Sequence, residues 1–130
     1  MGLLRWFTRN WANTVEPTHA DLVPLRVPLP EREVRSRIVA KIAAGVPGWR
    51  VEDAKDSAGR IHLTRRTRIC RFVDDVWLTL TPEEEGQVTR IDAESRSRVG
   101  VGDLGQNRRN IMELWSLLRQ EFAVSGETCR

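Results

Sequence analysis

Two alternating segments joined by a short acidic turn constrain the fold of this chain more than any other feature of its sequence. Every second residue from Val76 to Leu80 is apolar, and the later segment alternates small or apolar side chains with charged ones. The connection between them is Pro-Glu-Glu-Glu-Gly, residues 82–86. Alternation gives a strand one buried and one wet face, and so short a connection joins antiparallel strands. We therefore predict a hairpin with strands at residues 73–81 and 87–97.

Three further strands are predicted in the preceding sequence. Residues 49–54 and 60–66 form two of them, separated by the turn-forming sequence Asp-Ser-Ala-Gly at residues 56–59. A shorter alternating stretch, residues 23–29, lies among the prolines of residues 15–30. Proline is tolerated at the edge of a sheet but not in its centre, so this stretch is predicted to be an edge strand.

Two segments repeat apolar residues at helical spacing. The first begins after Pro30 and is predicted to end at Gly45. The second runs from about Leu104 to Phe122. Each helix needs a partner for its apolar stripe, and the sheet offers one apolar face. The predicted fold is therefore α+β: a two-layer sandwich, with an antiparallel β-sheet of about five strands and two helices on one face, in the order β-α-β-β-β-β-α.

Length and composition fit one domain, which we place at residues 28–123. The chain has 130 residues, of which 40% are hydrophobic and 30% charged, enough to bury a core. Before the domain we expect an amphipathic N-terminal segment at residues 1–14, then a linker and short edge strand at residues 15–27. Residues 124–130 are expected to form a disordered tail.

Composition excludes several classes of protein. Cys70 and Cys129 have neither the density nor the spacing of a disulfide framework or a zinc site, which favours a reduced, cytoplasmic location. No apolar run approaches the roughly 18–20 residues of a membrane span. Arg5 and Arg9 interrupt the only candidate for a signal-peptide core. We expect no metal and no cofactor.

The N-terminal segment has an apolar side. At helical spacing Arg5 and Arg9 lie opposite a group of apolar residues. These residues are Leu3, Leu4, Phe7 and Trp11. The segment either contacts a membrane surface or a protein partner, which would place the protein peripherally at the inner membrane, or covers an exposed sheet edge of its own domain.

A glycine-rich stretch precedes the last helix. Gly100, Gly102 and Gly105 spell a dinucleotide-binding pattern, but no following strand completes the βαβ unit that such a site requires. Asp103 stands at capping-box distance from Gln106. The stretch is either a structural turn or an anion site at a helix N-terminus, which Arg96, Arg98 and Arg108 would assist.

Asp74 shares its parity with the apolar residues of its strand, whereas Asp75 does not. A carboxylate on the core side is costly unless it is paired. Asp74 is therefore either a general base or metal ligand, or a buried partner of backbone amides or of an arginine such as Arg66 or Arg96. We favour the buried partner, because arginines lower a carboxylate pKa and repel cations.

The remaining reactive or basic residues give weak signals. Cys70, between two arginines, is more simply a core residue, and His19 and His62 are more simply surface residues. The arginine run from Arg60 to Arg71, near two tryptophans, suggests single-stranded nucleic acid, but no RNP-like aromatic motif accompanies it. We expect a salt-bridged, solvated sheet surface and no nucleic-acid partner.

Three motifs in series carry a family resemblance. They are Phe72-Val73-Asp74-Asp75-Val76, then Ser95-Arg96-Ser97-Arg98-Val99-Gly100, then Gly102-Asp103-Leu104-Gly105-Gln106-Asn107 with Ile111 downstream. Over roughly residues 28–118 the chain resembles the uncharacterised family catalogued as domain of unknown function 1499, a small bacterial or plastid-type domain. The resemblance implies that the motifs meet in space, with characteristic polar residues at Asp74, Asp75, Ser95, Arg96, Ser97, Arg98, Gly100, Asp103, Gly105 and Asn107. Gly102 departs from the pattern, where a serine is expected.

These observations give one candidate cluster and two hypotheses of function. The cluster, structural or ligand-binding, comprises Asp74, Asp75, Ser95, Arg96, Arg98, Asp103, Asn107 and Arg108. We expect a non-enzymatic binding or interaction module in which most of the cluster joins strand to helix. The alternative is an enzyme or binding protein for a small anionic molecule, with Arg96, Arg98 and Arg108 holding the anion and Asp74 acting as the base.

Overall fold

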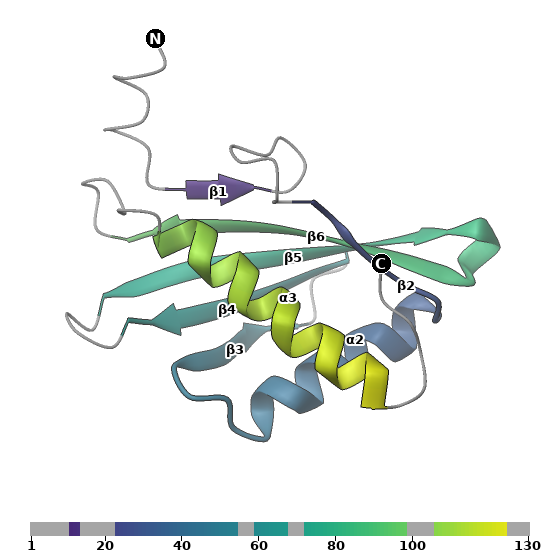
Figure 1. Ribbon diagram of the computed structural model, residues 1–130, viewed down its shortest axis with the longest axis horizontal. Coiled ribbons are helices and arrows are strands. Elements are labelled where there is room, and N and C mark those ends of the chain that lie inside the picture. Colours follow the sequence, from purple (N-terminus) through teal and green to yellow (C-terminus); the bar gives the residue numbers. More distant parts are fainter. Residues whose placement is uncertain (1–10, 14–22, 55–58, 68–71, 99–105, 125–130) are drawn as a thin grey trace, which may run out of the picture.

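One antiparallel sheet runs through the whole fold (Figure 1). The computed structural model describes residues 11–13, 23–54, 59–67, 72–98 and 106–124. The strands are β1 (Trp11–Asn13), β2 (Leu25–Val27), β3 (Trp49–Asp53), β4 (Arg60–Arg66), β5 (Val73–Glu83) and β6 (Val88–Ser97). The predicted hairpin, β5 and β6, lies at the centre of the sheet, with β4 and then β3 on one side. The α+β fold and the predicted order of elements are confirmed.

Two short strands share the other edge of the sheet. Both β1 and β2 pair antiparallel with β6, β1 opposite residues 94–96 and β2 opposite residues 89–91. They follow one another along the same edge, so the sheet has five positions although it has six strands. The helix predicted for the N-terminal segment is wrong for residues 11–13, which form the strand β1. Residues 1–10 lie outside the described part of the chain.

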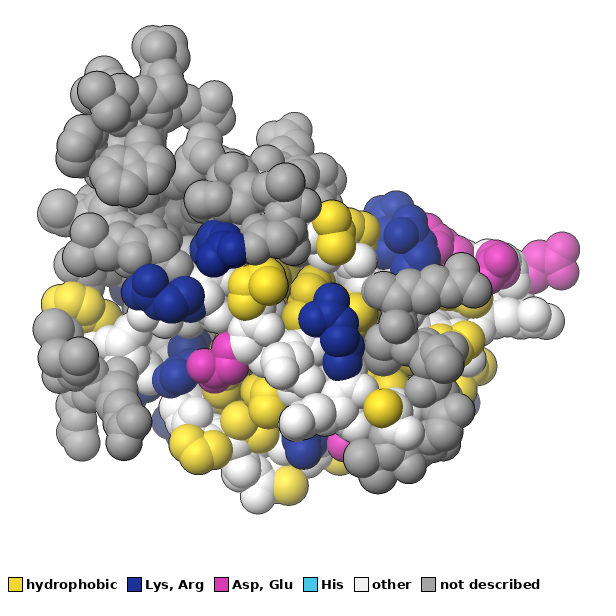
Figure 2. Space-filling view, viewed as in Figure 1, with side chains coloured by type: hydrophobic (Ala, Val, Ile, Leu, Met, Phe, Trp, Pro, Cys, Tyr) yellow, Lys and Arg dark blue, Asp and Glu magenta, His cyan; other side chains and the backbone are white. Residues whose placement is uncertain are grey.

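β5 runs two residues further than predicted, β6 begins one residue later, and the hairpin extends past the other strands to the turn η1 (Glu84–Gly86) (Figure 1). β5 includes Pro82, which cannot donate a backbone hydrogen bond. The Leu80 amide donates to the carbonyl of Gly59, the residue just before β4. Two residues further along β5, the nitrogen of Pro82 faces the same side as the Leu80 amide, but β4 does not extend that far. Proline therefore costs no ladder hydrogen bond here. Figure 2 shows acidic side chains gathered at this tip.

Both helices pack on the same face of the sheet. They are α2 (Glu31–Ala43) and α3 (Gln106–Val124). α2 follows Pro30 and ends before Gly45, whose φ of 114° is in the left-handed region that favours glycine, as the sequence predicts. Val34, Ile38 and Ile42 of α2 are buried in the same core as the stripe of α3.

The core is one continuous cluster between the helices and the inner face of the sheet. Leu25 and Val27 are fully buried in it, so β2 belongs to the same folded unit as the rest of the sheet. The buried apolar residues of α3 are Ile111, Leu114, Trp115, Leu118 and Phe122. The two-layer sandwich predicted from the apolar stripes is therefore the observed architecture.

Candidate functional site

The alternation along β5 places two adjacent carboxylates on opposite faces of the sheet. Asp74 lies on the inner face, which the helices cover, and is 1% exposed. Asp75 lies on the outer face, directly opposite Arg96 of β6 and bonded to Arg98. Ser95, by contrast, is fully buried on the inner face. The predicted cluster is therefore two groups, separated by the sheet itself.

The inner group joins β5 and β6 to the first turns of α3. We call it the buried polar cluster, and it consists of Asp74, Ser95, Ser97, Asn107 and Asn110. Asn110 Nδ2 donates hydrogen bonds to Asp74 Oδ2 at 2.8 Å and to Ser95 Oγ at 3.2 Å. Ser95 Oγ donates to Asn107 Oδ1 at 2.5 Å, and Asn107 Nδ2 donates to Ser97 Oγ at 3.1 Å.

Burial makes these bonds necessary. Asp74, Ser95, Asn107 and Asn110 are each at most 1% exposed, and a buried polar group left unpaired costs about 1–3 kcal/mol. The buried polar cluster therefore fixes the start of α3 to the sheet. Sequence reasoning did not single out Asn110, although it lies one turn before Leu114 on the buried stripe, a spacing that could have revealed it.

The outer group centres on Asp75. Arg98 donates from Nε to Asp75 Oδ2 at 3.0 Å and from Nη2 to Oδ1 at 2.9 Å. His62 Nε2 lies 2.8 Å from Asp75 Oδ1. The hydrogen bond from Arg98 lowers the pKa of Asp75 below its ordinary value; burial opposes this shift, and the contact with His62 adds to it.

His62 belongs to a row of stacked side chains that sequence reasoning missed. Its ring lies parallel to that of Trp77, with centroids 5.1 Å apart and planes at 11°. The Arg60 guanidinium lies 5.6 Å from the centre of the Trp77 ring. His62 and Trp77 pair directly across β4 and β5, and alternation assigns both to the outer face. Parity was therefore a signal that could have found this contact.

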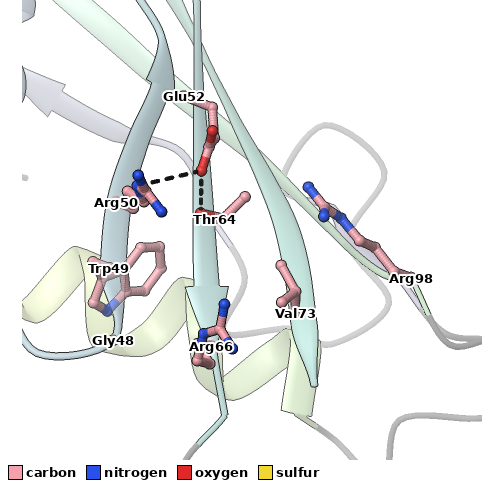
Figure 3. Close-up of a pocket in the computed structure, with 8 residues that line it drawn as sticks. All are labelled: Gly48, Trp49, Arg50, Glu52, Thr64, Arg66, Val73 and Arg98. Carbon is pink, nitrogen blue, oxygen red and sulfur yellow. Dashed lines mark hydrogen bonds and ion pairs between the residues drawn. The ribbon is translucent and has the colours of Figure 1, made fainter. Parts of the chain in front are cut away.

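A hollow of about 420 Å³ opens beside this group, where the strands end (Figure 3). We call it the outer hollow. It is lined by Gly48, Trp49, Arg50, Glu52, Thr64, Arg66, Val73 and Arg98. Gly48 carries no side chain and Val73 a short one, and they lie beside longer arginines on neighbouring strands. The small residues therefore leave open space between three guanidinium groups.

The three arginines of the outer hollow differ in how they are held. Arg98 is fixed by its two hydrogen bonds to Asp75. Arg50 is 79% exposed, and its Nε lies 4.0 Å from Glu52 Oε1. Arg66 is exposed, and although its backbone amide donates to the Gly48 carbonyl, its guanidinium has no hydrogen-bond or ion-pair partner in the part of the chain that the structure describes. Guanidinium groups in such a setting favour an anion that can accept several hydrogen bonds.

Other predicted site residues lie elsewhere. Arg96 is exposed on the outer face and pairs with Glu94 of its own strand. Arg108 is half-buried on α3. Trp11 lies in β1. Asp103, the three glycines of the glycine-rich stretch, Leu3, Leu4, Phe7, Cys70 and His19 lie outside the described residues.

The described arginines of the run from Arg60 to Arg71 do not form one patch. Arg65 lies against α3, where its Nε is 3.1 Å from Glu113 Oε1, whereas Arg66 faces the outer hollow. Trp49 Nε1 also donates to Glu113. Arg60 stacks on Trp77. Alternation thus distributes the described members of the run over two faces of the sheet.

Two searches of the described residues give negative results. No group of three or more His, Cys, Asp or Glu side chains there is arranged to hold a metal ion. None of the helices described is long and apolar enough to span a membrane.

Comparison with known proteins identifies a family. The chain matches none of the curated proteins with which it was compared. Residues 8–118 match the family described as "Protein of unknown function (DUF1499)", which confirms the resemblance inferred from the three motifs. The match extends over most of the chain and includes the buried polar cluster, Asp75, Arg98 and the outer hollow. The chain is therefore a member of the DUF1499 family.

Proposed function

We propose that this protein is a non-enzymatic binding module that takes a small anionic ligand in the outer hollow. The observation that carries the proposal is the hollow itself, which Arg50, Arg66 and Arg98 line and in which the Arg66 guanidinium has no partner among the described residues (Figure 3). Its volume of about 420 Å³ falls within the range of small-molecule sites.

Arg98 is held ready for such a ligand. Its two bonds to Asp75 use one hydrogen of Nε and one of Nη2, and a guanidinium has five N–H donors. Three donors therefore stay available while the side chain is already oriented. A preoriented side chain loses less conformational entropy on binding, which favours affinity.

The geometry supports binding rather than catalysis. Asp74 is 1% exposed on the inner face, so it does not share a site with Arg98 on the outer face. It accepts a hydrogen bond from Asn110, within a cluster that fixes α3. The arrangement in which Asp74 acts as a base beside an arginine-bound anion is thus not formed by these residues.

The proposal is tested by calorimetric titration of the full chain with inorganic phosphate. We expect binding to the wild type and a loss of roughly tenfold in affinity in Arg66→Ala, because a hydrogen bond to a charged group contributes about 1.5 kcal/mol or more. Arg119→Ala is the matched control, since it removes an exposed arginine from α3 on the other layer. No binding of phosphate, or equal binding by Arg66→Ala and the wild type, would overturn the proposal.

A further inference from the structure

The outer hollow contains a carboxylate that a site for simple anions would not need. Glu52 Oε1 accepts a hydrogen bond from the Thr64 hydroxyl at 2.9 Å and lies 4.0 Å from Arg50 Nε (Figure 3). The Glu52 side chain is 37% exposed, so its negative charge reaches the space that the arginines surround. A carboxylate beside a bound anion repels it, which weakens binding unless the ligand offers a compensating group.

Glu52 lies on the outer face of β3, next to an irregularity in its pairing with β4. Arg50 pairs with Thr64 and Val51 with Leu63, but the next pair joins Asp53 to His62. Glu52 is therefore the extra residue of a β-bulge, and alternation from Arg50, two residues earlier, assigns it to the outer face. Thr64, the partner of Arg50 on β4, lies on this same face, and its hydrogen bond to Glu52 holds the carboxylate there.

Glu52 retains capacity for a ligand. Its Oε1 atom receives the contacts from Thr64 and Arg50, whereas Oε2 has no partner among the residues that the structure describes. A carboxylate accepts about four hydrogen bonds, so a cationic donor can bind without displacing Thr64. Glu52 and Arg98 line the same hollow, and the charge of Glu52 adds to the effect of Asp75, which chiefly raises the pKa of Arg98.

We infer that the outer hollow selects a small aminoalkyl phosphate, with the phosphate bound by Arg66 and Arg98 and the ammonium group bound by Glu52. This inference rests on the proposed function and deepens it. Three guanidiniums around the hollow outnumber the carboxylates of Glu52 and Asp75, which favours a phosphate over a singly charged carboxylate. The ammonium group turns the repulsion by Glu52 into an attraction.

The test compares two soluble probes on the full chain, phosphoethanolamine and ethyl phosphate, which share a phosphate monoester and differ in the ammonium group. We expect wild-type protein to bind phosphoethanolamine roughly tenfold more tightly, as one charge-assisted hydrogen bond provides. In Glu52→Gln, which can still accept the Thr64 hydrogen bond, this preference should disappear, while ethyl phosphate should bind more tightly than to the wild type. Glu33→Gln, an exposed substitution on α2, should behave as the wild type.

Each result separates the inference from the proposed function. Equal affinities of the wild type for both probes, or an unchanged preference in Glu52→Gln, would overturn the selection by Glu52 and leave anion binding intact. Binding of neither probe would overturn both the inference and the proposed function.

A second experiment distinguishes the two sources of an aminoalkyl phosphate, a lipid headgroup and a free metabolite. It compares binding to vesicles that contain phosphatidylethanolamine with binding to vesicles of phosphatidylglycerol. Preference for the former, lost in Glu52→Gln, identifies a lipid headgroup, and binding of soluble phosphoethanolamine alone identifies a free metabolite.

Discussion

Asp74 and Asp75 are adjacent in the chain but have different surroundings. Asp74 is bonded to Asn110 inside the core, and Asp75 to Arg98 and His62 on the outer face. The strand period of two is the cause, and it was readable in the sequence. Applied to β6, the same parity would have shown that Ser95 and Arg98 face opposite ways. The expectation that one cluster contains all of them came from the family motifs, which give order along the chain but not the face of the sheet.

The two carboxylates should therefore differ in their contribution to stability. Asp74→Ala removes the nearer of the two buried acceptors of the Asn110 amide, and we expect a loss of about 2–3 kcal/mol in the free energy of unfolding. Asp75→Ala removes contacts of a partly exposed ion pair and should cost about 1 kcal/mol or less. Urea denaturation of both variants measures the difference. Equal losses would contradict the assignment of Asp74 to a buried structural cluster.

Asp75 also predicts a response to acid. Its pKa is lowered in the folded state, chiefly by Arg98, so its ionised form stabilises the fold above the ordinary carboxyl pKa, near pH 4. This contribution is lost as the pH falls through the lowered folded-state value. The stability difference between the wild type and Asp75→Asn should thus shrink from pH 7 to pH 3. Urea denaturation at both pH values provides the measurement, and a constant difference would show that the ionisation of Asp75 does not contribute.

At the scale of elements, prediction succeeded where the pattern was long. The range of β4, residues 60–66, is the predicted one, and α2 ends before Gly45 as expected. β1 was missed because three residues are too short to display a period, and their pairing with β6 is a contact between distant segments. The outer hollow was also beyond prediction. It depends on which arginines of different strands the register brings together, and the register arises only when the strands pair.

The loop before β3 makes a testable contribution through Gly48. Its φ is 84°, and a Cβ there would lie 2.0 Å from Arg65 Nη1, the side chain that binds Glu113 of α3. Gly86 has a nearly identical φ of 85° but open space around it. Alanine at either position incurs the left-handed backbone cost, whereas Gly48→Ala must also displace Arg65.

We expect Gly48→Ala to lose roughly 1–2 kcal/mol more than Gly86→Ala, as disruption of a charged hydrogen bond implies. Thermal or urea denaturation of the two variants gives the comparison. Equal losses would show that Arg65 moves aside without cost and that Gly48 is required only for its backbone conformation.

At the scale of the whole molecule, the fold extends beyond the segment that matches the family. The match ends at residue 118, but α3 continues to Val124. Its last turns carry Phe122, which is fully buried, and Glu121, which lies 3.0 Å from Arg37 of α2. The two helices are thus joined outside the matched segment. That contact was predictable in part, since Phe122 completes the apolar stripe, whereas the pairing of Glu121 with Arg37 depends on how the helices cross.

Phe122→Ala should therefore cost about 3–5 kcal/mol in the free energy of unfolding, as large truncations in a core do. Phe72→Ala is the control, because Phe72 is 48% exposed and should lose far less. Denaturation of both variants tests this prediction. A small effect of Phe122→Ala would mean that residues after 118 do not contribute to the domain.

The shared edge of the sheet has a practical consequence for protein engineering. Between Asn13 and Leu25 the chain advances 12 residues, but the paired positions on β6, Glu94 and Ile91, are only 3 apart. One uninterrupted edge strand would need 9 fewer residues to keep both registers. The length of this connection is therefore not dictated by strand pairing, and we expect an epitope tag or a reporter domain inserted between β1 and β2 to preserve every strand register and the outer hollow, which neither of these strands lines.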